Sequence, residues 1–517
     1  MQNFAEAVHS ALRAAERALT MPKIVFLATD IVLYLLLVAI ALYAWHALRT
    51  PTLRQTWRTV VRDPAAMSAA VVLGVFLLIS MLDSIHFRPL LPPAPGAAAD
   101  AAPAYSTRTL SLIDTLLAGP RESREKTYSV PLGTHQYSKE SMLVGGKTVR
   151  DYPRLRFGGA HLKDPETEWA GDVARRSAAG IAGGALGAAA LWLLVAALRA
   201  RAEKTSVGAS LRAIRQRATV VPLRPMLVTA GVLALFFGWV AALWPHYHVF
   251  GTDQTGNDVL FQAIKSIRTA VVIGSLATIA TLPFAIVFGI LAGYYKGRVD
   301  DAIQYLYTVL SSIPAVLLIA AFVLMIQVFI DKNPQMFETG LERADIRLFL
   351  LSVILGVTGW ATLARLLRAE TLKLTELDYV QAARAFGVSD AGIMRRHILP
   401  NVMHVVLIVA VLDFSGLVLL EAVLSYVGVG VDPTTNSFGT MINSARTELS
   451  RDPAVWWNLL AAFTLMVTLV LSMQLFASAV REAFDPRARA FRVRRSKPAA
   501  PGAASGAAAA PAPAPAE

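Results

Sequence analysis

The sequence contains no cysteine and is poor in charged residues. Without cysteine, the chain cannot form disulfides, thiolate metal sites or a cysteine nucleophile. Charged residues make up only 16% of its 517 residues, whereas a soluble domain carries about a quarter. Because 55% of the residues are apolar and the mean hydropathy is +0.50, an ordinary soluble protein is excluded.

The apolar residues gather in runs of roughly 20, the length that a helix needs to cross a hydrocarbon layer about 30 Å thick. These runs predict an all-α fold, a polytopic membrane helical bundle. Pro283 and Pro314 are expected to kink two of its helices. The predicted spans, about nine by this criterion, cover residues 24–47, 66–87, 177–198, 225–245, 269–293, 302–330, 347–367, 402–425 and 456–480.

The net charge is +13, and the Lys and Arg residues are scattered over short loops between the apolar runs. A nucleic-acid-binding protein would instead gather its basic residues on one domain. Basic segments at 49–62, 199–224 and 481–497 fall on one side of the membrane, together with a polar loop at 368–401. The positive-inside rule makes that side cytoplasmic, and the odd number of spans then places the N-terminus outside.

The polar loop at 368–401 is rich in helix formers as far as Phe386. Gly387 follows an alanine-rich turn, where a glycine can end a helix in the left-handed conformation. Ser389 or Asp390 can then cap a second short helix. The loop is therefore predicted to form a compact knob of two helices that a soluble partner can grip. The simpler alternative is an ordinary connector between two spans.

Residues 379–401 resemble the EAA loop of bacterial ATP-binding-cassette (ABC) importers, where the membrane subunit meets its ATPase. Other stretches match the same family in order and at similar spacing. Residues 250–260 resemble its GTD-x-x-GRDV segment, residues 419–433 its LLEAxLSFLGxGxxP segment, and residues 479–487 its LRDALDPR ending. From residue 250 to residue 486, the chain thus resembles the C-type permease subunit of dipeptide and oligopeptide importers.

The resemblance implies a multi-pass permease of the bacterial inner membrane that imports peptides or another small solute and is not itself an enzyme. Its implied partners are a second permease subunit, two ABC ATPases that bind ATP and Mg, and an extracytoplasmic substrate-binding protein. No cofactor, metal or nucleic acid is expected on this chain. Residues 141–148 end like a phosphate-binding loop but have Ser141 in place of the first glycine, so no ATPase site is predicted.

The resemblance also carries residue roles onto the matching positions. One departure lies in the EAA motif, where Gln381 stands in place of glutamate. Any ion pair of that glutamate would be lost, while the shape that depends on Gly387 should remain. The predicted ATPase-coupling residues are Tyr379, Gln381, Ala382, Ala383, Ala385, Gly387, Arg395 and Pro400, and those predicted to face the binding protein are Gly251, Asp253, Gly428, Gly430 and Pro433.

Asp413 and Glu421 lie in the eighth predicted span. Carboxylates inside a membrane are functional candidates by default, and each of these could line the transport pathway or be structural. Two other hypotheses stay open: a proton-coupled secondary transporter that uses Asp413 or Glu421, and a membrane scaffold that transports nothing. In the third span, a Gly180-x-x-x-Gly184 pair permits close packing of two helices.

These patterns divide the chain into segments. The last one is almost entirely Pro, Ala and Gly after residue 498 and buries too little apolar surface to order itself. The segments are an amphipathic N-terminal segment (1–23), the first two membrane helices (24–87), an extracytoplasmic loop or small domain (88–176), the third and fourth helices with a basic cytoplasmic loop (177–245), the permease core (246–486) and a basic, then Pro/Ala-rich tail predicted to be disordered (487–517).

Overall fold

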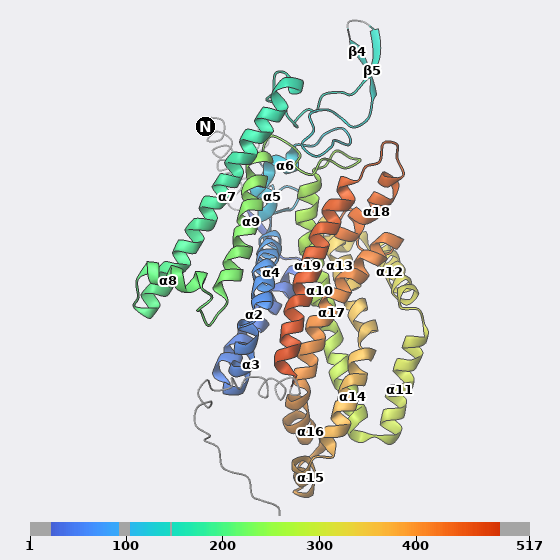
Figure 1. Ribbon diagram of the computed structural model, residues 1–517. Coiled ribbons are helices and arrows are strands. Elements are labelled where there is room, and N and C mark those ends of the chain that lie inside the picture. The colour runs from blue at the N-terminus through green and yellow to red at the C-terminus, as the bar shows by residue number, and fades with distance from the viewer. Residues whose placement is uncertain (1–21, 92–103, 145–146, 486–517) are drawn as a thin grey trace, which may run out of the picture.

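The computed structural model describes residues 22–91, 104–144 and 147–485, and its long helices run side by side along one axis (Figure 1). Within these residues, 8 helices are long and apolar enough to cross a membrane, or 9 if the bent pair α13–α14 is one span. This confirms the predicted polytopic all-α fold. Apart from Pro22 and Lys23, the predicted N-terminal segment (1–23) lies outside the described residues, as does the tail (487–517).

The core is built around α10, the most buried of the spans. Its side chains Ile273 and Ala277 are fully buried. Glycines let a neighbour approach closely: a Cβ added at Gly356 of α13 would lie 2.6 Å from the Ala277 carbonyl oxygen. The helices of the core are α10 (Val259–Tyr295), α13 (Gly340–Gly359), α14 (Ala361–Thr375), α17 (Leu399–Val427), α18 (Phe438–Leu449) and α19 (Trp457–Phe484).

The span predicted at 302–330 is divided into two helices. Ile313 is extended, with ψ 130°, because the ring of Pro314 disfavours helical backbone in the residue before it. Pro283, by contrast, lies inside α10, which continues past it. The divided segment consists of α11 (Gly297–Ser312) and α12 (Ala315–Lys332), followed by a single turn, η1 (Pro334–Met336).

Six described helices of nine residues or more precede the core, besides the short α5 and α6. Among them α7 is 39 residues long, which corresponds to about 58 Å at 1.5 Å per residue. It extends well beyond the apolar run predicted at 177–198. The six are α2 (Ala28–Arg49), α3 (Pro51–Val61), α4 (Pro64–Asp83), α7 (Pro165–Glu203), α8 (Val207–Arg215) and α9 (Leu223–Leu243).

Helices α7 and α9 pack through glycines. A Cβ added at Gly180 would lie 2.6 Å from the Gly238 carbonyl oxygen, and one added at Gly184 would lie 2.5 Å from the Ala234 carbonyl oxygen. Neither leaves room for a side chain. The close packing predicted from the Gly180-x-x-x-Gly184 pair is therefore confirmed.

The segment between α4 and α7 has secondary structure of its own and lies at the end of the bundle opposite α15 and α16 (Figure 1). One small sheet has the order β1-β2-β3, so it joins the chain before α2 to the chain after α4. The β4–β5 hairpin stands apart from it. The elements are β1 (Lys23–Val25), β2 (His86–Arg88), β3 (Leu110–Ser111), α5 (Leu112–Leu116), α6 (Ala118–Glu122), β4 (Glu140–Val144) and β5 (Lys147–Asp151).

Residues 104–164, which we call the insertion, are held on the loop that leads into α10. Glu125 of the insertion accepts hydrogen bonds from the backbone amides of residues 156–158 at 2.7–3.1 Å. Its carboxylate also lies 3.5 Å from Nε2 of His248, whose Nδ1 lies 2.9 Å from Asp258. Burial lowers the pKa of His248, but the bonds to Asp258 and Glu125 outweigh it and raise the pKa to about 9.

The packing of α7 on α9 generates the first prediction. Gly184→Ala should destabilise the protein by about 1–3 kcal/mol, the usual cost of overpacking, because the new methyl group meets backbone. Gly183→Ala is the matched control, since nothing lies within 4 Å of a Cβ there. Thermal unfolding of the purified protein measures both. Equal melting temperatures for the two variants would contradict the close contact.

The second prediction concerns pH. Because the pKa of His248 rises from 6.5 to about 9 on folding, its stabilisation is fully present below pH 6.5 and is lost as the pH rises through about 9. The difference in thermal stability between the wild type and His248→Gln should therefore shrink over that range. A difference that does not change with pH rules out this role for His248.

Candidate functional site

The polar loop forms the predicted knob beyond the ends of α10 and α14 (Figure 1). The structure divides it into a short helix, a glycine turn and a second short helix that runs on into α17. We call residues 376–398 the coupling knob. Its elements are α15 (Asp378–Ala385), α16 (Asp390–Ile393) and the π-helical turn η2 (Met394–Ile398).

Gly387 ends α15 in the way the sequence predicts. Its φ is +76°, a left-handed conformation that costs a residue with a side chain about 1–2 kcal/mol. The amide of Gly387 bonds to the Arg384 carbonyl and that of Val388 to the Ala383 carbonyl, at 3.0 and 3.1 Å, which is the Schellman pattern. Ser389 then caps α16 by accepting a bond from the Gly392 amide.

Pro400 lies in the first turn of α17, and its missing amide hydrogen accounts for the π-helical form of the preceding turn, η2. Proline has no amide hydrogen to donate to the carbonyl four residues earlier. Residues 394–398 take the wider π-helical form, which is rare and is found as single turns inside longer helices. The second helix of the knob therefore enters the membrane span without a loop.

The knob has a buried root and an exposed tip. Val380, Ile393 and Ile398 are buried in one apolar cluster with side chains of α10, α14 and α17, among them Ile290 and Leu367. At the tip, the ring of Phe386 is 87% exposed. The knob is thus packed directly against three spans.

Gln381 makes a bond that glutamate cannot make. Its side-chain amide donates to the Thr375 carbonyl oxygen at 2.7 Å, and an ionised carboxylate has no hydrogen to donate. The substitution therefore ties the end of α14 to α15. Sequence reasoning found the lost charge but missed this bond.

Tyr294 at the end of α10 is a second residue that sequence reasoning missed. Its hydroxyl donates to Asp390 at 2.6 Å, and the Arg384 guanidinium lies 5.3 Å from its ring centre. The residue thus joins α10 to both short helices of the knob. No local pattern signals this, because the partners lie about 90 or more residues away in the sequence.

The other predicted coupling residues lie on the same knob, except Pro400, which lies just beyond it in α17. Ala382, Ala385, Arg395 and Pro400 are exposed, and Ala383 packs against the buried root. The hydroxyl of Tyr379 accepts a bond from the Asn401 amide at 3.2 Å. The structure therefore brings all the predicted coupling residues into one region at one end of the bundle.

The residues predicted to face the binding protein lie at the other end, but they differ in exposure. Gly428, the left-handed end of α17 with φ +88°, and Pro433 are exposed. Gly430 is buried against Ser425, and Gly251 is buried under the insertion, where an added Cβ would meet the Ser129 carbonyl oxygen. Asp253 is half-buried and accepts the amides of Thr255 and Asn257, at 2.8 and 2.9 Å.

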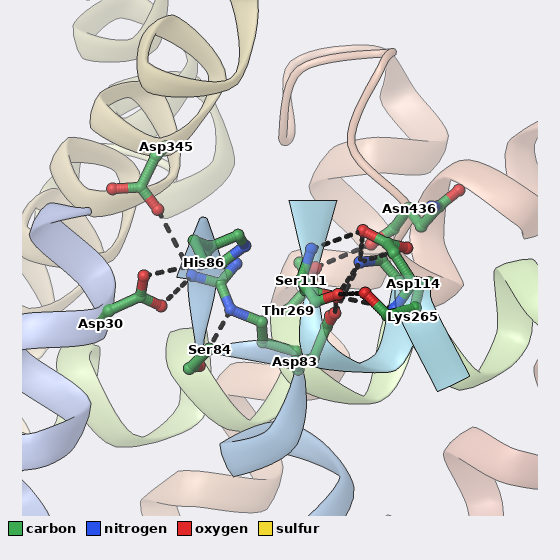
Figure 2. Close-up of polar contacts among 12 residues, drawn as sticks. Asp30, Asp83, Ser84, His86, Ser111, Asp114, Lys265, Thr269, Asp345 and Asn436 are labelled. Atoms are coloured by element: carbon green, nitrogen blue, oxygen red, sulfur yellow. Dashed lines mark hydrogen bonds and ion pairs between the residues drawn. The ribbon is translucent and has the colours of Figure 1, made fainter. Parts of the chain in front are cut away.

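A buried polar cluster lies where α2, α4, α10 and α13 meet near the insertion (Figure 2). The Arg268 guanidinium donates to Asp30 at 2.6 Å and lies 3.6 Å from Asp345. His86 lies 2.8 Å from the other oxygen of Asp30. All four side chains are at least nine-tenths buried. Removing one partner of a buried ion pair costs about 3–5 kcal/mol, so the cluster holds these helices together.

One turn earlier in α10, Lys265 extends the same cluster. Its ammonium group lies 2.5 Å from Asp83 and 3.2 Å from Asp114 (Figure 2). Ser111 bridges them, since its hydroxyl donates to Asp83 at 2.6 Å. The cluster therefore fixes the insertion, through α5, to the start of α10.

The two membrane carboxylates have different surroundings. Glu421 is buried and accepts a hydrogen bond from Ser425 at 2.7 Å, close to Gly439 of α18. Asp413 is half-buried near the middle of α17, and no described residue forms a hydrogen bond or ion pair with it. The hydrogen bond of Glu421 favours a structural role for this residue. The carboxylate of Asp413 is available to bind another group.

Comparison with known proteins gives one consistent result. The family described as binding-protein-dependent transport system inner membrane component matches residues 285–490. The oligopeptide transport system permease protein OppC of Escherichia coli K12 is 31% identical over 242 residues, which is 47% of this chain and 73% of the relative. OppC of Haemophilus influenzae is 29% identical over 243 residues, 47% of this chain and 71% of the relative.

The dipeptide permease DppC of Lactococcus lactis is 28% identical over 241 residues, 47% of this chain and 64% of the relative. Among solved structures, an inward-facing form of the MetNI methionine ABC transporter aligns with a TM-score of 0.32 and 18% identity, covering 43% of this chain and 93% of that one. The family match begins after α9, so the first helices and the insertion lie outside it. With its apolar spans, this chain belongs to the family of binding-protein-dependent transport system inner membrane components.

Proposed function

We propose that this chain is a permease subunit of an ATP-driven importer for peptides or similar small solutes. It forms the translocation pathway with a second permease and is driven by two ATPase subunits that dock on the coupling knob. The observation that carries the proposal is the knob itself, with an exposed aromatic tip and a root buried in three spans. The permease names of the relatives support peptides as the solute.

The energy has to come from a partner. Strands β4 and β5, at 140–144 and 147–151, pair in antiparallel fashion, whereas a phosphate-binding loop needs a strand followed by a helix. The segment that resembles such a loop in sequence therefore has the wrong local structure for it. ATP and Mg would bind to the partner subunits.

A displacement of the knob can be transmitted to three helices. Through Tyr294 and Asp390 it is joined to α10, and through Gln381 and Thr375 it is joined to α14. Because η2 continues into α17, a displacement of α16 also moves that span. Closure of two ATPases around the knob would thus tilt α10, α14 and α17 together.

The position of the extra helices supports a pathway on the opposite side of the bundle. Helices α7, α8 and α9 lie on one side in Figure 1, and α11 and α12 on the other. Large apolar side chains are exposed on α11 and α12, for example Tyr305 and Leu317. We place the second permease against α11, α12 and the exposed side of α17.

The binding protein would meet the end of the bundle that carries the insertion. Gly428 and Pro433 are exposed there, while the insertion covers Gly251. The proposed docking surface therefore includes residues of the insertion in place of the covered loop before α10.

The third prediction tests the knob. Phe386→Ala should lower ATP-driven uptake by about 30-fold, since truncating an aromatic anchor at an interface costs about 2 kcal/mol or more. The amount of protein in the membrane should not change, because the ring contacts little of its own chain. Reconstituted complexes with the second permease and both ATPases measure uptake and solute-stimulated ATP hydrolysis.

Leu186→Ala is the control, because it removes another exposed apolar side chain, 72% exposed against 87% for Phe386, from α7, far from the knob. It should leave uptake unchanged. If Phe386→Ala transports as fast as the wild type, or if uptake persists without any ATPase, the knob is not the drive site. Uptake driven by a proton gradient alone would favour the secondary-transporter hypothesis.

The fourth prediction concerns Asp413, for which we propose a place on the pathway, facing the protonated amino group of a peptide. Asp413→Asn should lower uptake of peptides with a free amino terminus by roughly tenfold, which is about 1.4 kcal/mol. N-acetylated peptides of the same sequence are the internal control and should be unaffected. A loss that is equal for both peptides contradicts the proposed contact.

A further inference from the structure

A pocket of about 250 Å³ lies on the cytoplasmic side, between the start of α4 and the linker from α8 to α9. Three arginines line it, Arg62, Arg217 and Arg224. Three prolines form part of its wall and fix the backbone there, at positions 64, 222 and 225. We call it the arginine pocket.

The arginines bring positive charge that the described part of the chain does not balance. No described carboxylate lies within ion-pair distance of the three guanidinium groups, and Arg224 donates only to the Arg215 carbonyl at 3.2 Å. Asp63, next to Arg62, uses its carboxylate to cap α4 by accepting the Ala66 amide at 2.8 Å. Three cations around one pocket repel one another unless an anion lies between them.

Arg217 occupies a backbone position that normally belongs to glycine. Its φ is +58°, and the amides of residues 217 and 218 bond to the carbonyls of Ile214 and Ala213 at 3.2 and 2.9 Å. This is the end of α8 in the Schellman pattern, where glycine avoids the strain of a left-handed residue. An arginine there costs stability and points to a role for its side chain.

Backbone groups add to the attraction for an anion. Helices α4 and α9 both begin at the pocket, at Pro64 and Leu223, and α9 has no side chain that caps its first amides. The amino-terminal end of a helix carries partial positive charge. An anion in the pocket would thus interact with three guanidinium groups and two helix ends.

Because α4 and α9 both begin their apolar spans at the pocket, we expect it to lie at the level of the lipid phosphates of the inner leaflet. One wall is Val220, whose side chain is 73% exposed. An apolar wall beside a basic pocket between spans suits an amphiphile, and such pockets on the cytoplasmic side bind anionic headgroups.

We propose that the arginine pocket binds a phosphate group, that of an anionic phospholipid headgroup or of a free phosphate. The walls come from the α3–α4 junction and from the α8–α9 linker. The bound phosphate therefore joins the α7–α9 hairpin to α4. This is separate from transport of the solute and does not depend on the coupling knob.

The full-length purified protein tests this in two titrations, one with short-chain phosphatidylglycerol and one with inorganic phosphate, with zwitterionic phosphatidylcholine, which has no net charge, as the reference. Saturable binding is read by native mass spectrometry and by the rise in melting temperature. The triple variant R62Q/R217Q/R224Q should bind about a hundredfold more weakly, since each basic side chain at a membrane contributes about a factor of five. The control R54Q/R201Q/R212Q removes three arginines of α3, α7 and α8 that are exposed, as those of the pocket are, but lie outside it.

Binding of phosphatidylglycerol alone identifies a lipid, and equal competition by inorganic phosphate identifies a free anion. Both outcomes support the pocket if only R62Q/R217Q/R224Q weakens binding. The proposal is overturned if the two triple variants lose affinity equally, because the effect is then one of total charge. It is also overturned if the wild type shows no saturable binding of either ligand, a result that needs no variant.

Discussion

The charge of Arg268 is the constraint on which the arrangement of the helices depends. A guanidinium buried inside a bundle is tolerated only with counter-charges and hydrogen bonds around it. Asp30 of α2 supplies one counter-charge and Asp345 of α13 the other. One residue belongs to the helices that precede the family match, and the other belongs to the core. Helix α2 is therefore part of the bundle and cannot leave it without exposing an unpaired charge.

Helix α10 makes contacts with other elements near both ends of the bundle. Near its start, α10 holds Lys265 and Arg268, which contact the insertion and the first helices. At its end, Tyr294 contacts the coupling knob. Glycines at 289 and 293 let α14 pack directly on its second half. Helix α10 is thus closely packed along its length and held by side-chain contacts at each end.

Local patterns in the sequence predicted the features that depend on neighbouring residues. The apolar runs predicted the spans, and Gly387 predicted the end of α15. Gly180 and Gly184 predicted a close contact between two helices. What the sequence could not provide depends on partners far along the chain. Arg268 and Asp30 are 238 residues apart, and Thr252 and Ser129 are 123 apart. The burial of Gly251 under the insertion and the bond from Gln381 to Thr375 also arise from tertiary packing. Packing of the surrounding helices also decides that the helix breaks before Pro314 but continues past Pro283.

Helix α7 is much longer than the hydrocarbon layer of a membrane is thick. About 58 Å of helix at 1.5 Å per residue meets a hydrocarbon layer of about 30 Å, so a large part of α7 stands outside it. Near its outer end, Asp172 bonds to His161 and Tyr247 at 2.8 and 3.0 Å, which fixes the helix to the loop before α10. Helices tilt when bilayer thickness changes. A change in bilayer thickness that tilts α7 would therefore also displace the loop before α10, because Asp172 joins the two.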